Sequence, residues 1–261
     1  MFVTTAARHA SSLEEEAKRI ASELSIPYIP REGRSLQFLQ NEHESGCLVA
    51  GRERMEIYPF GQAGPFFFHP NSASFRVKRL MRGETDPFVE AAELKPGMSM
   101  ADCTLGIGSD AIVASYITGA EGSVIGIEAN PYTAYVVRKG MAEWTSGVPA
   151  LDEAMRRVDI RTGFYEEFLS VLPDRSIDCV YFDPMFDEAV RATGGIEELR
   201  QLAVTDRLSG AAVNEALRVA RRRVVLKDHF RSPLFAEYGF RQLVRKSCKF
   251  HYGIIDLSLY E

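Results

Sequence analysis

The amino-acid sequence predicts an α/β protein whose main part is a mostly parallel, doubly wound sheet, preceded by a smaller α/β unit. Three observations support this prediction. From about residue 84 onward, short apolar runs alternate with amphipathic stretches, and repeated βαβ units of this kind build parallel sheets. The last two β-prone runs have no helix between them, which is typical of an antiparallel hairpin. Before residue 69 the runs are shorter and follow a different rhythm.

The first 68 residues predict a small N-terminal α/β unit. Short β-prone runs predict strands at 2–5, 26–29, 47–50 and 55–58, of which the last two form a hairpin. Apolar residues at helical spacing predict helices over 11–24 and near 36–40. Gly-Pro and His-Pro pairs punctuate 61–70, so we expect the domain boundary there, with units 1–68 and 69–261.

The sequence of the larger domain, 69–261, predicts seven strands. Five apolar runs predict parallel strands at 99–103, 123–127, 158–162, 177–182 and 223–227. Helices are expected at 87–94, from 109, at 131–144, after 162 and within 195–220. Two closing antiparallel strands at 241–248 and 251–259 complete the sheet.

The net charge of −5 and the pI near 5.7 exclude a generally basic coat for nucleic acid. Two local basic clusters remain, Arg76 to Arg82 and Arg221 to Arg223. Solvated helix faces explain each cluster equally well. A phosphate-binding role for either cluster therefore stays open at this point.

The four cysteines are widely spaced, and no Cys-x-x-Cys or histidine spacing suggests a metal site. We therefore expect no metal, no disulfide framework and a reducing, cytoplasmic setting. Apolar stretches stay shorter than 18 residues, so a membrane span is not expected either.

A glycine-rich loop follows the first strand of the main domain. Asp102 ends that strand, and Gly106 and Gly108 allow a tight turn into the next helix and a close approach of backbone to a ligand. The second strand ends in Glu128, about 20 residues later. An acid at that position accepts hydrogen bonds from both ribose hydroxyls of an adenosine-bearing cofactor.

Two cofactors compete for this loop. Gly106, Gly108 and Ala111 satisfy the dinucleotide pattern G-x-G-x-x-G/A, so NAD must be considered. Asp102 and Asp110 oppose a pyrophosphate, although an acid in a first helical turn is also favourable by itself. S-adenosylmethionine carries a sulfonium and an ammonium group and no phosphate. The acids therefore favour S-adenosylmethionine over NAD.

The tetrapeptide Asp183-Pro184-Met185-Phe186 follows the apolar run 177–182. Asp183 offers carboxylate oxygens to an amino group, and Pro184 has no N–H, so neighbouring carbonyls can turn toward a ligand. Phe186 offers a ring face on which a base can stack. Alone, the tetrapeptide also fits a strand end with a core phenylalanine. The glycine loop about 75 residues upstream favours the functional interpretation, with Asp183, Pro184 and Phe186 as catalytic residues.

These motifs resemble a known family. The stretch 102–111, Glu128 and the tetrapeptide 183–186, in this order and spacing, are similar to class I S-adenosylmethionine-dependent methyltransferases. The tetrapeptide and the strand 222–227 resemble the RsmJ group, which methylates the exocyclic N2 of a guanine in small-subunit ribosomal RNA. The resemblance implies a Rossmann-like seven-stranded methyltransferase sheet, S-adenosylmethionine as cofactor and an RNA substrate.

The resemblance also implies roles for single residues. Ser109 and Asp110 would lie at the methionine end of the cofactor, Glu128 would hold the ribose, and Gly163 and Phe164 would flank the adenine. Asp183 would border both the cofactor and the methyl acceptor.

Several questions stay open on the sequence alone. Lys227 suits a substrate-side charge and a salt bridge to Asp183 equally well. The acceptor is either ribosomal RNA or a small-molecule or protein amine, and in the latter case residues 1–68 would cover a pocket. A non-catalytic cofactor-binding protein is disfavoured because Asp183 and Gly106 are both present.

Overall fold

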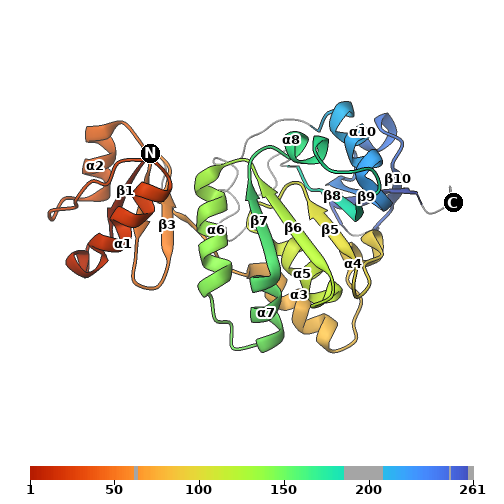
Figure 1. Ribbon diagram of the computed structural model, residues 1–261, viewed down its shortest axis with the longest axis horizontal. Helices are drawn as coiled ribbons and strands as arrows, with labels where there is room; N and C mark the ends of the chain where they lie inside the picture. The colour runs from red at the N-terminus through yellow and green to blue at the C-terminus, as the bar shows by residue number, and fades with distance from the viewer. Residues whose placement is uncertain (62–63, 185–207, 247, 258–261) are drawn as a thin grey trace.

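The computed structural model describes residues 1–61, 64–184, 208–246 and 248–257 (Figure 1). These residues form a seven-stranded sheet and a separate four-stranded sheet. The strands of the large sheet are β5 (Ser99–Asp102), β6 (Ser123–Glu128), β7 (Val158–Thr162), β8 (Ile177–Phe182), β9 (Ala220–His229), β10 (Arg241–Leu243) and β11 (Phe250–Asp256). The helices around it are α3 (Asn71–Met81), α4 (Pro87–Ala92), α5 (Ser109–Thr118), α6 (Pro131–Glu143), α7 (Pro149–Arg157), α8 (Tyr165–Ser170), α10 (Gly210–Val219) and α11 (Leu234–Glu237).

The large sheet has the strand order β10-β11-β9-β8-β5-β6-β7. Strands β5 to β9 are parallel, while β11 pairs antiparallel with both β9 and β10. This confirms the predicted mostly parallel sheet with an antiparallel C-terminal hairpin. The chain winds outward in opposite directions from the β5–β8 pair, and ligands of such sheets bind beyond the carboxyl ends of the strands at this point.

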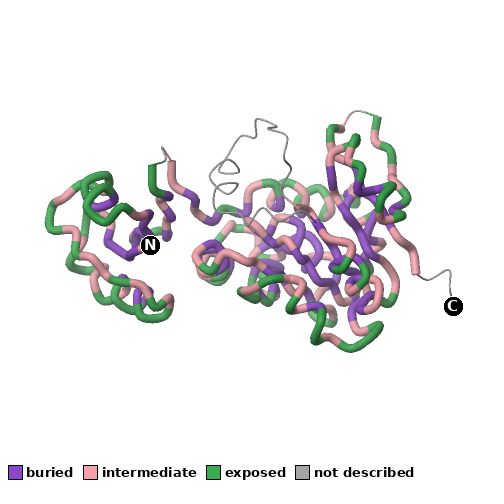
Figure 2. The backbone as a smooth tube through the Cα atoms, turned by 90° about the horizontal axis from the view of Figure 1, so that it is seen from above, coloured by how far each residue is buried: buried purple, intermediate pink, exposed green. Residues whose placement is uncertain are grey.

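Alternating residues of the central strands bury side chains on both faces of the large sheet. On β8, Cys179 and Tyr181 pack with the layer of α3 to α7, whereas Val180 and Phe182 pack with α8, α10 and α11. All four side chains are fully buried. A parallel strand covered on both faces needs this continuous apolar sequence. In Figure 2 the buried residues, drawn in purple, are concentrated in the interior of the larger part of the molecule.

The four-stranded sheet belongs to the N-terminal part of the chain. Its strands, in spatial order, are β1 (Phe2–Thr5), β2 (Cys47–Ala50), β3 (Met55–Tyr58) and β4 (Phe66–Phe67), with helices α1 (Ala10–Glu23) and α2 (Leu36–His43). The predicted hairpin is confirmed, since β2 and β3 pair antiparallel. The predicted strand 26–29 is wrong: only Tyr28 forms a bridge, to Val3. Pro27 lacks the N–H that a full strand would have to donate.

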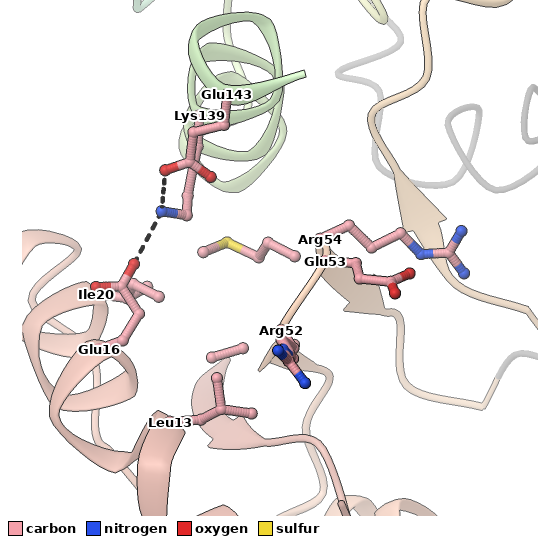
Figure 3. Close-up of a pocket in the computed structure, with 11 residues that line it drawn as sticks. Leu13, Glu16, Ile20, Arg52, Glu53, Arg54, Lys139 and Glu143 are labelled. Atoms are coloured by element: carbon pink, nitrogen blue, oxygen red, sulfur yellow. Dashed lines mark hydrogen bonds and ion pairs between the residues drawn. The ribbon is translucent and has the colours of Figure 1, made fainter. Parts of the chain in front are cut away.

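Helix α6 packs against the large sheet and also against β3 of the small sheet. Lys139 Nζ lies 2.9 Å from Glu16 of α1 and 2.6 Å from Glu143 (Figure 3). Close by, Gly140 lets the ring of Phe68 lie against the helix backbone, where a Cβ would collide with it. A pocket of about 170 Å³ lies where α6 packs against the N-terminal unit, and Lys139 and Glu143 are among the residues that line it. Because α6 starts at the carboxyl edge of the sheet and these residues lie in its last turns, the pocket faces away from that edge.

Helices α3 and α7 are additions to the predicted elements. Each buries only a few residues, Ala73 and Val77 in α3 and three residues in α7, between exposed polar side chains. Within the described residues, no helix has the length and apolar character needed to span a bilayer. The same residues contain no group of three or more His, Cys, Asp or Glu side chains placed to hold a metal ion.

Candidate cofactor and acceptor site

The glycine loop leaves the carboxyl end of β5 and leads directly into α5. Gly106 and Gly108 have φ angles of 51° and 80°, in the left-handed region. A side chain at Gly108 would collide with the Met141 methyl group of α6. The loop therefore lies close against α6.

Glu128 holds this loop in place from the end of β6. Its Oε2 accepts a hydrogen bond from the Gly106 N–H at 3.1 Å, and its Oε1 accepts one from the Asn130 N–H at 2.9 Å. Burial raises the pKa of the Glu128 carboxyl. Each carboxylate oxygen retains further acceptor capacity, so Glu128 can also receive hydroxyl donors from a ligand.

Asp102 places a second acid at this edge, only 1% exposed. Its Oδ1 accepts a hydrogen bond from the Thr104 N–H at 3.1 Å. Burial, reinforced by the negative charge of Asp110, raises the pKa of Asp102 well above its ordinary value. Among the described residues, no cationic side chain forms a hydrogen bond with Asp102. A cationic ligand group beside it would stabilise its ionised form.

Gly163 and Phe164 follow β7 at the same edge. The Gly163 N–H donates to the backbone carbonyl of Glu128 at 3.0 Å, and its φ of 143° requires glycine. The ring of Phe164 is 45% exposed. An exposed ring at this edge is accessible to a ligand, and the resemblance predicts that it flanks the adenine.

Asp183 joins the glycine loop to the neighbouring strand β9. Its N–H donates to Thr104 Oγ1 at 2.6 Å, and its Oδ2 lies 2.5 Å from Lys227 Nζ. The salt bridge to Asp183, one of the two roles that the sequence left open for Lys227, is therefore present. The sheet register explains the contact, because Phe182 of β8 pairs with Leu226 of β9 and the next residues of both strands lie side by side.

Beneath Asp183, the carboxylate of Asp110 lies in a buried network of charges. Lys227 Nζ lies 3.4 Å from its Oδ2, the Tyr181 hydroxyl donates to the same oxygen at 2.9 Å, and Arg76 Nη1 lies 2.5 Å from its Oδ1. Arg76 also forms a bidentate pair with Asp86, at 2.7 and 2.8 Å. The carboxylate of Asp110 is therefore engaged inside the protein by three described side chains.

The network determines the charges of its members. Burial alone would raise the pKa of Asp110, but Lys227 and Arg76 hold it below its ordinary value. Burial would lower the pKa of Lys227, but Asp110 and Asp183 raise it, so the ammonium stays protonated. Burial raises the pKa of Asp183, and Lys227 offsets only part of this effect.

The structure brings most of the predicted site residues to one edge of the large sheet. These residues are Asp102, Gly106, Gly108, Ser109, Glu128, Gly163, Phe164, Asp183 and Pro184. Asp110 starts α5 nearby, but its carboxylate points into the network described above. Phe186 lies outside the described residues.

Arg76 and Thr104 belong to this site, although the sequence does not predict them there. The sequence places Arg76 in a basic cluster, whereas its guanidinium lies between two buried carboxylates. The other arginines of that cluster, Arg79 and Arg82, both pair with Glu84. The Asp-Pro pair at 86–87, which caps α4, was the only local signal of a structured acid near Arg76.

Comparison with known proteins identifies the family. The model of a family described as "Putative SAM-dependent methyltransferase" matches residues 33–250, well over half of the chain. The chain belongs to this family. The methyltransferase thus uses S-adenosylmethionine as its cofactor, and the resemblance found in the sequence is confirmed.

Relatives of the methyltransferase cover nearly its whole length. The uncharacterized protein YpiP of Bacillus subtilis is 46% identical over 98% of this chain and 100% of its own. Ribosomal RNA small subunit methyltransferase J of Thioalkalivibrio sulfidiphilus is 26% identical over 93% of this chain and 94% of its own. The SAM-dependent methyltransferase NGO1261 of Neisseria gonorrhoeae has the same fold, with a TM-score of 0.61 at 15% identity over 98% of this chain and 96% of its own.

The side chains at the carboxyl edge of the sheet fit S-adenosylmethionine. Glu128 offers acceptors to ribose hydroxyls, and the buried carboxyl of Asp102 suits an ammonium group. A dinucleotide would bring its pyrophosphate close to Asp102, and this negative charge would oppose ionisation of the carboxyl, whereas an ammonium group favours it. The bound cofactor would supply an electrophilic methyl group on its sulfonium.

Proposed function

We propose that this methyltransferase methylates an exocyclic amino group of a planar ring, with guanine N2 in small-subunit ribosomal RNA as the acceptor. The observation that carries this proposal is the placement of Asp183. Its backbone is tied to Thr104 of the cofactor loop and its Oδ2 is held by Lys227. A carboxylate fixed in this way is positioned to bind an amine beside the sulfonium methyl.

Within the described residues, Asp183 Oδ1 accepts no hydrogen bond, so this oxygen is available to a substrate N–H. The lone pair of an aryl amine is delocalised into its ring, which makes the nitrogen a poor nucleophile. Hydrogen bonds from the amine to Asp183 Oδ1 and to a main-chain carbonyl near Pro184 would favour a pyramidal nitrogen and stabilise its developing positive charge. Alignment of the nitrogen with the methyl group supplies most of the acceleration.

The proton inventory of this reaction is simple. The nitrogen would gain the methyl group and a positive charge as the S–CH3 bond breaks and S-adenosylhomocysteine leaves as a neutral thioether, and the product ammonium would then lose one proton to Asp183 or to water. No separate strong base is needed. Lys227 does not compete for this proton, because its neighbours keep it protonated.

Similarity to ribosomal RNA small subunit methyltransferase J over 93% of the chain supports RNA as the acceptor. A base paired in the folded RNA would have to leave its stack, at a cost of a few kcal/mol. We infer that stacking on Phe186 offsets part of this cost.

Transfer of tritiated methyl groups tests the proposal directly. Ribosomal RNA and small subunits from a strain lacking the gene are incubated with the enzyme and labelled S-adenosylmethionine, in parallel with total metabolites and total protein. We expect label in small-subunit RNA, at guanine N2. Label only in metabolites or protein would replace RNA by a small-molecule or protein amine.

An Asp183→Ala variant tests the role of the carboxylate. We expect it to bind S-adenosylhomocysteine normally and to lose transfer activity at least 100-fold. Asp178→Ala is the matched control, since this acid on the same strand lies at the opposite, amino end and bonds with Ser99. Full transfer by Asp183→Ala would contradict the proposed mechanism.

A further inference from the structure

A basic surface that the sequence analysis overlooked lies beside the acceptor site. It consists of the turn after β9 and the loop between β10 and β11. We call it the basic tip and define it by Phe230, Arg231, Arg245, Lys246 and Lys249. Residues 229–251 contain five Lys or Arg and a single Glu, although the whole chain has a net charge of −5.

The strand order places the basic tip at the carboxyl edge of the sheet. Strand β9 carries Lys227 into the site and ends at His229, two residues later. At about 3.3 Å per residue, the turn starts roughly 7 Å beyond Lys227. Strand β11 runs antiparallel, and its first residue, Phe250, pairs with His229. The β10–β11 loop therefore returns to the same edge as Asp183.

Most cations of the two basic clusters noted in the sequence are paired with carboxylates, and among the described residues only Lys78 and Arg222 of these clusters form no ion pair. Arg76, Arg79 and Arg82 are all paired with carboxylates. Arg221 and Arg223 are paired as well, with Asp178 and with Asp256 and Glu93. By contrast, Arg231, Arg245, Lys246 and Lys249 form no ion pair with any residue that the structure describes. Their charge is available to an anionic partner.

Hydrogen bonds fix the backbone of the basic tip. The Phe230 N–H donates to the Lys249 carbonyl at 2.9 Å, and Gln242 Nε2 donates to the Phe230 carbonyl at 2.9 Å. The buried ring of His251 contacts Gln242 Nε2 at 2.8 Å and the Arg245 carbonyl at 3.0 Å. The two segments thus form one unit. These bonds hold Arg245 and Lys249 beside the turn after β9.

Phe230 adds an aromatic surface to the charges. Its ring is 39% exposed, and the Arg231 guanidinium lies 4.9 Å from the ring centroid. Exposed rings next to cations are typical of single-stranded nucleic-acid binding, since bases stack on the ring while cations contact the phosphates. An anionic protein surface would pair with the cations but would offer no base to stack on the Phe230 ring.

We propose that the basic tip binds the RNA backbone next to the target nucleotide and so holds the acceptor base over Asp183. This inference rests on the proposed function, because it requires an RNA substrate. The cations would contact phosphates flanking the target, and Phe230 would stack on a neighbouring unpaired base. The tip is a binding surface and takes no part in the chemical step.

The test compares two double variants that remove the same charge. Lys246→Ala/Lys249→Ala alters the basic tip, while Arg8→Ala/Arg52→Ala removes two exposed cations of the N-terminal unit that also lack an ion pair among the described residues. Affinity for small-subunit RNA is measured by filter binding in the presence of S-adenosylhomocysteine, at several salt concentrations. Transfer kinetics are measured in parallel. Calorimetric binding of S-adenosylhomocysteine checks that each variant is folded.

For the tip variant we expect at least tenfold weaker RNA binding, a similarly raised KM for RNA and a kcat within twofold of wild type. The slope of log affinity against log salt should become shallower by about 1.4, for two lost contacts to single-stranded phosphates. The control variant should match wild type. Equal RNA binding by the two variants, or an unchanged salt slope, would overturn the inference.

The same measurements separate this inference from the proposed function. Wild-type protein that binds RNA through the basic tip but transfers no methyl group to it would overturn the proposed function and leave the tip as an RNA-binding surface. If the wild type methylates RNA and the tip variant binds and methylates RNA equally well, the basic tip is overturned as an RNA-binding surface and the proposed function stands. No measurable RNA binding by the wild type would overturn both.

Discussion

Lys227 Nζ lies 2.5 Å from Asp183 Oδ2 and 3.4 Å from Asp110 Oδ2, so one partly buried ammonium is shared by two carboxylates. Asp183 belongs to the proposed acceptor site, and Asp110 belongs to the charge network beneath it. Lys227 therefore links the ionisation of the site to the stability of the fold. Both consequences are open to measurement.

Replacing Lys227 by Met should change the pH profile of transfer. Burial raises the pKa of Asp183 and Lys227 lowers it, so losing the ammonium should raise this pKa further. The ionised carboxylate is the better acceptor for an amine N–H. Activity should therefore rise with pH, with its acid limb displaced to higher pH in Lys227→Met. At pH values below the acid limb, each pH unit of displacement lowers the rate about tenfold.

The pH dependence of kcat/KM, measured from pH 5 to 10, checks this prediction. Lys227→Arg keeps the positive charge and should keep most of the wild-type profile. An unchanged acid limb in Lys227→Met would show that the ionisation of Asp183 does not control transfer.

Removing Arg76 should destabilise the fold. Its guanidinium lies between Asp86 and Asp110, both of which are buried. Breaking a buried ion pair from one side typically costs about 3–5 kcal/mol, because the remaining charge is left without compensation. We expect Arg76→Leu to lower the free energy of unfolding by roughly this amount in urea titrations.

Arg79→Leu is the matched control for that measurement, since Arg79 lies on the same helix and pairs with Glu84 at the surface. Exposed pairs contribute little to stability. The unfolding midpoint of the control should stay close to that of wild type. Similar midpoints for Arg76→Leu and Arg79→Leu would contradict a structural role of the network.

Much of the fold could be predicted because the central strands are apolar on both faces. The run Cys179, Val180, Tyr181 and Phe182 is continuously apolar, and all four side chains are buried. Helix α3 could not be predicted in this way. It packs against α5 through Ala73 and Val77, and the buried ion pairs of Arg76 join it to acids that are distant in the sequence.

The candidate site divides in a similar way. Asp102, Glu128 and Asp183 each lie at or just after the carboxyl end of a parallel strand, so the motif spacing alone placed them together. The partner of Arg76 lies 34 residues away along the chain, and no local pattern reports such a contact. The basic tip was missed because it forms only when β11 inserts between β9 and β10.

Glu128→Gln should weaken cofactor binding. The carboxylate accepts hydrogen bonds from Gly106 and Asn130 and is the expected acceptor for the ribose hydroxyls. A hydrogen bond to a charged group contributes about 1.5–3 kcal/mol. This corresponds to roughly tenfold to hundredfold weaker binding of S-adenosylhomocysteine in calorimetric titrations. Glu121→Gln, an exposed acid just before β6, should bind like wild type, and equal affinities for the two variants would exclude Glu128 as a ribose ligand.

Asp102→Asn should stabilise the free protein and weaken cofactor binding at once. Burial raises the pKa of Asp102 well above its ordinary value, so over the interval between these two values the unfolded chain is ionised while the folded chain keeps its proton. The unfolded state then binds fewer protons, and stability falls as pH rises through this interval. Asparagine stays neutral and can still accept the Thr104 N–H, so the melting temperature at neutral pH should rise.

Binding should show the opposite sign. A ligand ammonium beside Asp102 favours its ionised form, so at pH values below the raised pKa the wild-type protein should release a proton as the cofactor binds. Calorimetry in buffers of different ionisation enthalpy counts these protons. We expect the release to disappear in Asp102→Asn and the affinity to fall roughly tenfold to hundredfold, as for the loss of a charged hydrogen bond. Unchanged affinity and proton release in Asp102→Asn would place the cofactor ammonium elsewhere.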